Sequence, residues 1–246
     1  MGTIEIIVPV RPGGVDKFQV KHDPDRIKTT VVECADGNLS RVWRDAYVAS
    51  DADVVVFKHD DFWFRNWLSY EAQLWAMIDR YPILGVAGAR SFIPRKAAWW
   101  QQTETRHDFI DGVCRGMVSH PTPDPLKKIG RIGTFFPTFY GPPGPVVVMD
   151  GCCIAVKRNV DSDTFGDYTL DDIAGWWDTD FTYHFYDIAF TMNATLAFQE
   201  KKLGASCYVL IADVVHQSGG DTGEDYMQHA IRFATKYDRE KAIRAK

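Results

Sequence analysis

The chain has 246 residues, of which 46% are hydrophobic and 25% are charged, and its formal net charge is -5. This length fits one large α/β domain or two small ones, and the acidic balance excludes a surface that is basic all over for nucleic-acid binding. The sequence shows neither CxxC cysteine spacing nor an apolar run of membrane-spanning length. We therefore expect reduced thiols in a cytoplasmic protein, in the cytoplasm of a host if the source is viral.

Strands and helices alternate over the first 89 residues. Strands are predicted at 3–10, 29–34, 53–58 and 83–87, from their short apolar runs and the turn residues around them. Apolar residues at helical spacing predict one helix that begins at Asn38 and a second over about 67–81. This alternation is typical of an α/β fold with a mostly parallel central sheet covered by helices.

Residues 90–145 lose this periodicity and are rich in proline, glycine and aromatic residues, which predicts an irregular aromatic-rich insertion rather than a linker. Beyond it we predict strands at 146–149 and 152–156, an acidic loop at 161–180, a helix at 182–203 stopped by Gly204, and a strand at 208–215. Asp221 and Glu224 have the spacing of a capping box, which predicts a C-terminal helix to about residue 243. We expect a single domain over 1–246, divided into 1–89, the insertion 90–145, and 146–246.

The apolar strand at 54–57 ends in His59, Asp60 and Asp61. Ligands of open α/β sheets bind beyond the carboxyl ends of the strands, and carboxylates there can hold a hard divalent cation against a phosphate. The alternative is an acidic turn exposed to solvent. His216 also follows an apolar strand, so it is either a ligand of the same cation or a structural histidine.

Two further pairs could take part in chemistry. His184 and Asp187 are three residues apart and would share one face of a helix; Asp187 is then either a first-turn acid or a general base. Asp150 and Gly151 separate two predicted strands, and they form either a tight turn or a place where sugar hydroxyls approach the backbone.

Taken in order, these segments resemble the GT-A glycosyltransferases of the family 2 type, in particular a small glycosyltransferase-like group from bacteria and viruses. The resemblance spans nearly the whole chain outside 90–145. It rests on six segments: Ile6–Val10, Gly37–Ser40, Val55–Asp61, Val148–Gly151, Phe185–Ile188 and His216–Gly220.

The resemblance implies a hexosyltransferase that uses a nucleotide-sugar, a UDP-sugar by preference, together with Mn²⁺ or Mg²⁺. His59–Asp61 stands where the family has its DXD-like motif, although a histidine holds the first position. The metal ligands would be Asp61 and His216. Residues 1–89 would bind the nucleotide and residues 146–246 the acceptor. The donor would lie against Val10, Glu33, Asn38, Asp60, Asp150 and Gly151.

Asp187 matches the acid of the family's ED-like motif, although Tyr186 precedes it where the family has a second acid. As a base, with His184 beside it, Asp187 would give inversion at the anomeric carbon. If it only orients the acceptor, retention of configuration remains open.

The acceptor is expected to be a hydroxyl of a saccharide or a small molecule. Basic residues outnumber acidic ones over 90–131 and 232–246, and Trp99 and Trp100 could stack on a base, so hydroxymethylated pyrimidines in DNA are an alternative acceptor. Two other hypotheses are an inactive binding module and a metal-dependent phosphohydrolase. The phosphohydrolase would use Asp60, Asp61, His184 and His216.

Overall fold

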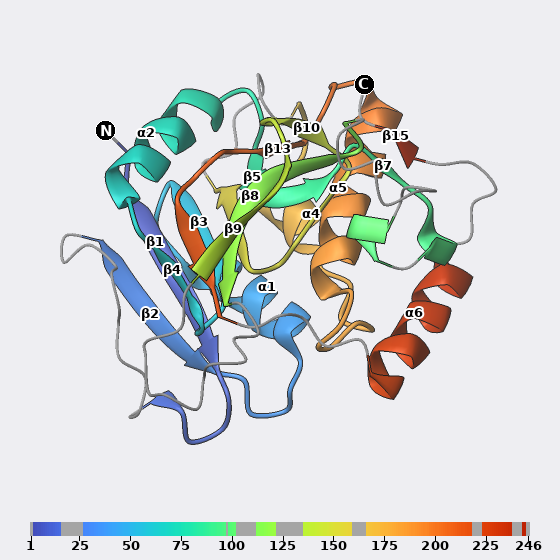
Figure 1. Ribbon diagram of the computed structural model, residues 1–246, viewed down its shortest axis with the longest axis horizontal. Coiled ribbons are helices and arrows are strands. Elements are labelled where there is room, and N and C mark those ends of the chain that lie inside the picture. Colours follow the sequence, from blue (N-terminus) through green and yellow to red (C-terminus); the bar gives the residue numbers. More distant parts are fainter. Residues whose placement is uncertain are drawn as a thin grey trace.

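The protein folds as a mixed α/β structure in which two sheets pack with helices around them (Figure 1). The computed structural model describes residues 2–15, 27–96, 98–101, 112–121, 135–158, 166–217, 223–237 and 243–244. Within these ranges no helix is long and apolar enough to cross a membrane.

The main sheet has seven strands in the order β10-β13-β5-β12-β3-β1-β2. The strands are β1 (Ile4–Val10), β2 (Lys28–Glu33), β3 (Val54–Lys58), β5 (Ile83–Gly85), β10 (Gly144–Val146), β12 (Cys153–Lys157) and β13 (Cys207–Val209). Strands β2, β1 and β3 run parallel, as predicted, and every residue of β1, β3 and β12 is buried. A strand buried on both faces needs an almost continuous apolar sequence, which explains the run at 54–57.

The prediction of a mostly parallel sheet is wrong for β12, which runs antiparallel to both β3 and β5. The chain enters β12 from the turn at 150–152, which lies where β3 ends, and Cys153 is paired with Lys58. A parallel connection would need a crossover of a dozen or more residues, so a strand that starts at this edge must run back along β3.

A second sheet has the order β11-β6-β8-β14-β4, with β9 paired to β8. Its strands are β4 (Phe62–Phe64), β6 (Ala87–Ala89), β8 (Cys114–Pro121), β9 (Phe135–Gly141), β11 (Val148–Met149) and β14 (Val214–His216). The predicted strands at 83–87 and 208–215 are each split, into β5 and β6 and into β13 and β14, because the chain passes from the main sheet to the second one. The insertion is therefore only partly irregular, since β8 and β9 complete this sheet.

Short elements complete the region after β6. Strand β7 (Ser91–Phe92) pairs with β15 (Ile243–Arg244), and two 3-10 turns follow it, η2 (Pro94–Lys96) and η3 (Trp99–Gln101).

The helices are α1 (Leu39–Ala49), α2 (Trp67–Met77), α4 (Leu170–Ala174), α5 (Tyr186–Lys201) and α6 (Glu224–Lys236). Asn38 caps α1 as predicted: its side chain accepts a hydrogen bond from the Arg41 amide. Helix α4 lies within the predicted acidic loop, where Thr169 and Asp172 form a capping box.

The last two helices differ from their predicted limits. Helix α5 begins at Tyr186 rather than at 182, and it ends at Lys201 because Lys202 adopts a left-handed backbone, two residues before Gly204. Helix α6 ends at Lys236 rather than near residue 243. Its N-cap is Gly223, so the helix does not begin with the predicted capping box of Asp221 and Glu224; Asp221 itself lies outside the described residues.

In the second sheet, Gly116 of β8 lies against the backbone of Val86, where the chain passes from β5 to β6. Its φ is +107°, and a Cβ there would lie 2.0 Å from the Val86 carbonyl oxygen. We expect Gly116→Ala to lower the free energy of unfolding by on the order of 3 kcal/mol, from the steric clash and the left-handed strain together. Urea unfolding measures this value.

Gly204→Ala is the matched control, because Gly204 has a φ of +93° but no atom within 4 Å of the position of a Cβ. This variant retains only the strain, about 1–2 kcal/mol. Equal losses in the two variants would show that the close contact with Val86 does not constrain Gly116.

Candidate functional site

The candidate site lies at the carboxyl end of β3, in the turn His59–Asp61. The His59 amide donates to the Cys152 carbonyl at 3.1 Å, and the Phe62 amide donates to the His59 carbonyl at 3.2 Å. The buried Lys58 ammonium donates to the Phe62 carbonyl at 2.9 Å. These bonds hold the turn between β12 and β4.

The pairing of β4 with β14 brings His216 to this turn. The two strands are antiparallel with His216 opposite Phe62, and the Gln217 amide donates to the Asp61 carbonyl at 3.0 Å. As a result, His216 Nε2 lies 3.3 Å from Asp61 Oδ1. The sequence predicted that these two side chains meet, and the structure brings them together through β4, a strand that the sequence did not predict.

His59 completes a three-residue cluster, which we call the β3 cluster: His59, Asp61 and His216. His59 Nδ1 lies 3.2 Å from His216 Nε2, and the three side chains offer ligand atoms within 4.8 Å of one another. Two imidazoles and one carboxylate form a donor set that suits a divalent transition metal ion. The other nitrogen of His59, Nε2, lies 2.6 Å from the Tyr186 hydroxyl, which fixes the orientation of the ring.

The charges around the β3 cluster favour a cation. Burial and the neighbouring His216 lower the pKa of His59 to about 4, so this imidazole is neutral at pH 7 and able to coordinate a metal. Burial opposes protonation of His216, but the hydrogen bond to Asp61 and the charge of Asp150 outweigh it and raise its pKa. Burial would also raise the pKa of Asp150, yet His216 and the Cys152 amide lower it, so this carboxylate stays ionised.

Asp150 and Gly151 form the turn between β11 and β12. The carboxylate of Asp150 accepts from the Cys152 amide at 2.9 Å and from Trp99 Nε1 at 3.1 Å. A Cβ at Gly151 would lie 2.3 Å from the Tyr186 hydroxyl and 2.8 Å from Asp187 Cβ. Gly151 is therefore needed for the close approach of α5, an intramolecular reason for a glycine that the sequence did not reveal.

Asp187 stands in the first turn of α5 against this glycine. Its Oδ2 accepts from the Gly151 amide at 2.6 Å, and its Oδ1 accepts from the Ile188 amide at 2.8 Å. Burial, followed by the charge of Asp150, raises the pKa of Asp187 to about 7. A carboxyl group that titrates near neutral pH is suited to proton transfer at that pH.

Helix α5 is held against the strand before the turn. Thr191 Oγ1 accepts from the Met149 amide at 3.1 Å, and Thr195 Oγ1 donates to the Val147 carbonyl at 3.0 Å. Immediately before the helix, Phe185 has a φ of 64°, a left-handed conformation that costs a bulky residue about 1–2 kcal/mol. Such strain is common at functional sites, and here it immediately precedes Tyr186 and Asp187.

His184 does not share a helix face with Asp187, contrary to the prediction, because it precedes α5 and the left-handed Phe185 separates the two. Its contacts are with α6: its Nε2 lies 3.5 Å from Asp225 Oδ2, and its ring packs against the rings of Tyr226 and His229.

The residues predicted to bind the nucleotide lie at the ends of the first elements. Val10 is paired with Glu33 across β1 and β2, and Glu33 accepts from the Gly13 amide at 3.2 Å. Both polar atoms of the Asn38 side chain have protein partners, since it also donates to the Thr179 carbonyl at 3.1 Å. Asp60 is an exposed residue, but partial desolvation of its carboxyl, followed by the charge of Asp61, raises the pKa of that carboxyl, and the charge of Arg11 opposes the shift.

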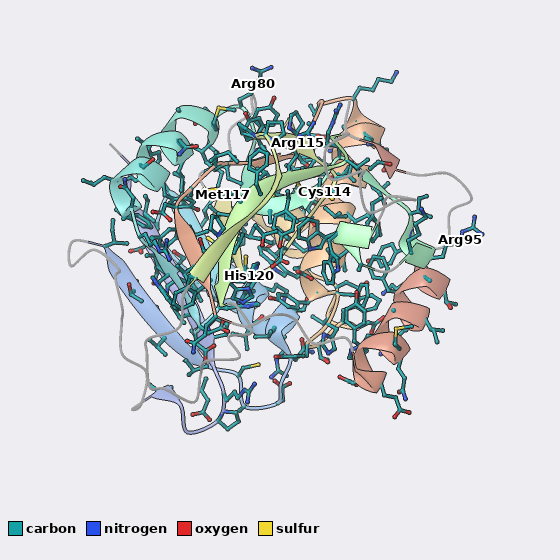
Figure 2. All side chains as sticks on the ribbon, in the orientation of Figure 1. Arg80, Arg95, Cys114, Arg115, Met117 and His120 are labelled. Carbon is teal, nitrogen blue, oxygen red and sulfur yellow. The ribbon has the colours of Figure 1, made fainter. Side chains whose placement is uncertain are left out.

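Sequence reasoning missed several neighbours of the β3 cluster. Tyr186 contacts His59, and Trp99 contacts Asp150. His120, labelled in Figure 2, extends from β8 with its ring 5.8 Å from that of His216. The sequence contained no usable signal for His120, because its strand was not predicted, and none for the direction of Tyr186.

The features proposed for a DNA acceptor gain little support. Trp99 is only 3% exposed, so it cannot stack on a nucleotide base as predicted. In the C-terminal segment, Arg232 pairs with Asp180 at 3.6 Å, and Lys236 pairs with Asp178 at 2.7 Å. Many other basic residues of the two segments lie outside the described residues.

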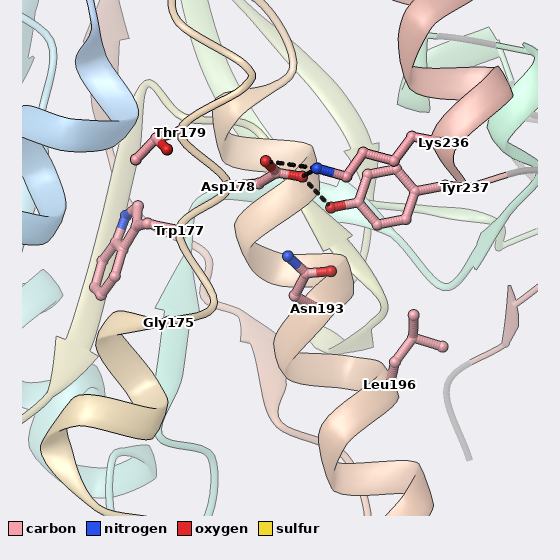
Figure 3. A pocket seen from close by; sticks show the side chains of 8 residues that line it. All are labelled: Gly175, Trp177, Asp178, Thr179, Asn193, Leu196, Lys236 and Tyr237. Atoms are coloured by element: carbon pink, nitrogen blue, oxygen red, sulfur yellow. Dashed lines mark hydrogen bonds and ion pairs between the residues drawn. The ribbon is translucent and has the colours of Figure 1, made fainter.

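An open depression of about 680 Å³ lies beside α5 and α6 (Figure 3). Lys236 and Tyr237, which line it, both bind Asp178, and Trp177 and Asn193 also belong to its lining. None of its lining residues belongs to the β3 cluster or contacts Asp187 in the bonds described above, so it is a separate feature of the surface.

Comparison with known proteins supports the fold. No protein-family model matches the chain, and no curated protein matches it by sequence. Among solved structures, it is similar to GalNAc-T7 with UDP, GalNAc and Mn²⁺, at a TM-score of 0.51 and 11% identity, over 96% of this chain and 48% of that one. At this identity the similarity concerns the fold alone.

Weaker matches include A197 from STIV and HddC from Yersinia pseudotuberculosis. The TM-score to A197 is 0.37 at 11% identity, over 86% of this chain and 83% of that one. The TM-score to HddC is 0.35 at 12% identity, over 93% of this chain and 78% of that one.

The bond between Tyr186 and His59 should contribute to stability. Tyr186→Phe would leave Nε2 of the partly buried His59 without this hydroxyl, and we expect a loss of about 1–2 kcal/mol in the free energy of unfolding. Tyr183→Phe, at a side chain that is 50% exposed, is the control and should stay within about 0.5 kcal/mol of the parent. Chemical denaturation of both variants measures the difference; equal stabilities would rule out a structural role for the 2.6 Å contact.

Proposed function

We propose that this protein is a metal-dependent glycosyltransferase that moves a sugar from a nucleotide-sugar, a UDP-sugar by preference, to a hydroxyl acceptor. The observation that supports it most is the juxtaposition of two groups at one sheet edge. The β3 cluster offers a cation site, and Asp187, with a pKa near 7, lies across Gly151 from it. The fold similarity to GalNAc-T7, a structure that contains UDP, GalNAc and Mn²⁺, is consistent with a GT-A assignment.

In this proposal His59, Asp61 and His216 hold the cation. The two imidazoles favour Mn²⁺ over Mg²⁺, because Mg²⁺ prefers an all-oxygen octahedral shell. When bound, the ion would neutralise the negative charge that develops on the departing diphosphate.

Asp187 is the proposed base. It would accept the proton of the acceptor hydroxyl as that oxygen bonds to the anomeric carbon and the bond from that carbon to the diphosphate oxygen breaks. Attack opposite the leaving group inverts the anomeric centre, so the anomer of the product, read by NMR, tests this part. His184 has no part in the proposed proton transfer, because it precedes α5 and contacts Asp225 and Tyr226 of α6.

The proposed contacts to the nucleotide-sugar donor are inferred from where the residues lie in the fold. Val10 and Glu33 lie at the carboxyl ends of β1 and β2, where a base and ribose would bind, with Asn38 at the start of the next helix. Asp60 lies next to the β3 cluster and would face the donor. Both oxygens of Asp150 are bonded within the protein, so we propose that Asp150 and Gly151 shape the sugar site mainly through their backbone.

The central test is metal-linked nucleotide binding. We expect calorimetry to show UDP binding that tightens with Mn²⁺, and we expect Asp61→Asn to weaken Mn²⁺ binding roughly 10- to 100-fold. Asp213→Asn is the control, since it removes a charge from an exposed carboxylate at the start of β14 that pairs with Arg65. UDP binding that is strong and indifferent to Mn²⁺ would reject a metal-dependent transferase in favour of a binding module.

Asp187 has its own test. Asp187→Asn should retain UDP affinity and lower kcat by about 10²–10⁴-fold, because the variant cannot accept the proton. In the parent, Asp187 is protonated below its pKa of about 7, so kcat should fall as the pH drops through 7 and stay level above it. A pH profile that is flat between 5 and 8, or full turnover in Asp187→Asn, would exclude the base role.

The acceptor is best found by screening UDP-sugars against simple glycans, small alcohols, hydroxymethylated DNA and water, with mass spectrometry of the products. Transfer to glycans or small molecules is the expected outcome. Transfer confined to modified DNA would restore the nucleic-acid alternative. Release of UMP and sugar phosphate, from cleavage of the diphosphate, would indicate a phosphohydrolase.

A further inference from the structure

A second group of metal-ligating side chains lies where α6 meets the segment before α5. It consists of His184, Asp225 and His229, whose ligand atoms lie within 4.8 Å of one another. We call it the α6 cluster. It shares no residue with the β3 cluster, and the glycosyltransferase chemistry proposed above does not use it.

The secondary structure brings these three side chains together before any metal binds. Asp225 and His229 are four residues apart on α6, so they lie on one face of the helix. His184 approaches from the turn before α5, with its Nε2 3.5 Å from Asp225 Oδ2 and its ring centroid 5.6 Å from that of His229. Tyr226 packs its ring against both His184 and Phe185, which limits the movement of the two elements.

An ion pair between His184 and Asp225 does not account for the whole arrangement. Asp225 is 72% exposed, and exposed pairs of this kind contribute only about 0–1 kcal/mol. Within the described part of the chain, the buried Nδ1 of His229 has no hydrogen-bond partner. An unsatisfied buried nitrogen costs about 1–3 kcal/mol, and coordination of a metal through Nδ1 would remove that cost.

The geometry is close to what one ion requires. Ligands around a tetrahedral zinc ion lie roughly 3.4 Å apart, because each is about 2.1 Å from the metal. The 3.5 Å between His184 Nε2 and Asp225 Oδ2 already matches this value, and all three ligand atoms lie within 4.8 Å of one another. Two imidazoles and a carboxylate suit Zn²⁺ or a similar borderline ion, and a water molecule can complete the shell on the exposed side.

We propose that the α6 cluster is a second metal site, specific for Zn²⁺ or a chemically similar transition-metal ion, that fastens α6 to the segment bearing Tyr186 and Asp187. The position of Tyr226 on α6 agrees with a link between the α6 cluster and the segment that bears Tyr186 and Asp187. Its ring centroid lies 5.1 Å from that of Phe185, the residue immediately before Tyr186 and Asp187.

The experiment uses a full-length protein without a histidine tag, in which Asp61→Asn and His216→Asn disable the β3 cluster. Titration with Co²⁺, followed by its visible absorption, should show one ion per chain with the intense bands of a four- or five-coordinate site. Zn²⁺ should displace the Co²⁺ and raise the melting temperature. Because no turnover is measured, failure here and failure of the proposed glycosyltransferase are separate results.

Single changes in that background test the ligands. Asp225→Asn and His229→Gln should each weaken Co²⁺ binding by more than about tenfold. Glu224→Gln, which makes the same change of charge one residue earlier on α6, should leave binding intact. Asp225 is largely exposed, so its variant should fold even if His229→Gln does not.

The proposal is overturned if the background protein binds no Co²⁺ or Zn²⁺ at micromolar concentrations. It is also overturned if Asp225→Asn and Glu224→Gln bind equally well, since ordinary surface attraction would then explain the binding.

Discussion

The antiparallel pairing of β4 with β14 is the constraint on which the candidate site depends. It sets His216 opposite Phe62, next to the turn at the end of β3, and so brings Asp61 and His216 within 3.3 Å although they are far apart in sequence. A slip of one residue in this register would turn His216 to the other face of the sheet. The hydrogen bond from the Gln217 amide to the Asp61 carbonyl opposes such a slip.

The second constraint is electrostatic, because the site gathers several titratable groups whose pKa values are shifted by burial and by one another. As a result, His59 is neutral and Asp150 is ionised at pH 7, whereas Asp187 titrates near that pH. Groups buried this way are costly unless they are bonded, and the Cys152 and Gly151 amides supply bonds to the two carboxylates. The turn at 150–152 therefore has two effects: its amides bind the carboxylates of Asp150 and Asp187, and it sets the antiparallel direction of β12.

The sequence predicted the strongly patterned elements. It also predicted the convergence of Asp61 with His216, because each stands at the end of an apolar run, although in the structure the two meet through the pairing of β4 with β14 in the second sheet. It did not predict β4, since three residues are too few to show a period. Nor did it predict the reversal of β12, which depends on where the chain re-enters the sheet. The sequence could not predict the partners of His184 and Tyr186, because the direction of both side chains depends on the left-handed backbone of Phe185 between them. No pattern of side chains in a sequence indicates such a conformation.

The short segment from His184 to Asp187 has consequences for how the protein can vary. His184 contacts α6, Phe185 packs against Tyr226 and Phe233, Tyr186 bonds His59, and Asp187 bonds Gly151. Individual side chains here can be exchanged one at a time, at a cost set by each contact. An insertion or deletion is different, because a shift of one residue rotates every later position of α5 by about 100°. Chain length between His184 and Asp187, more than the identity of any one residue, is what this architecture holds fixed.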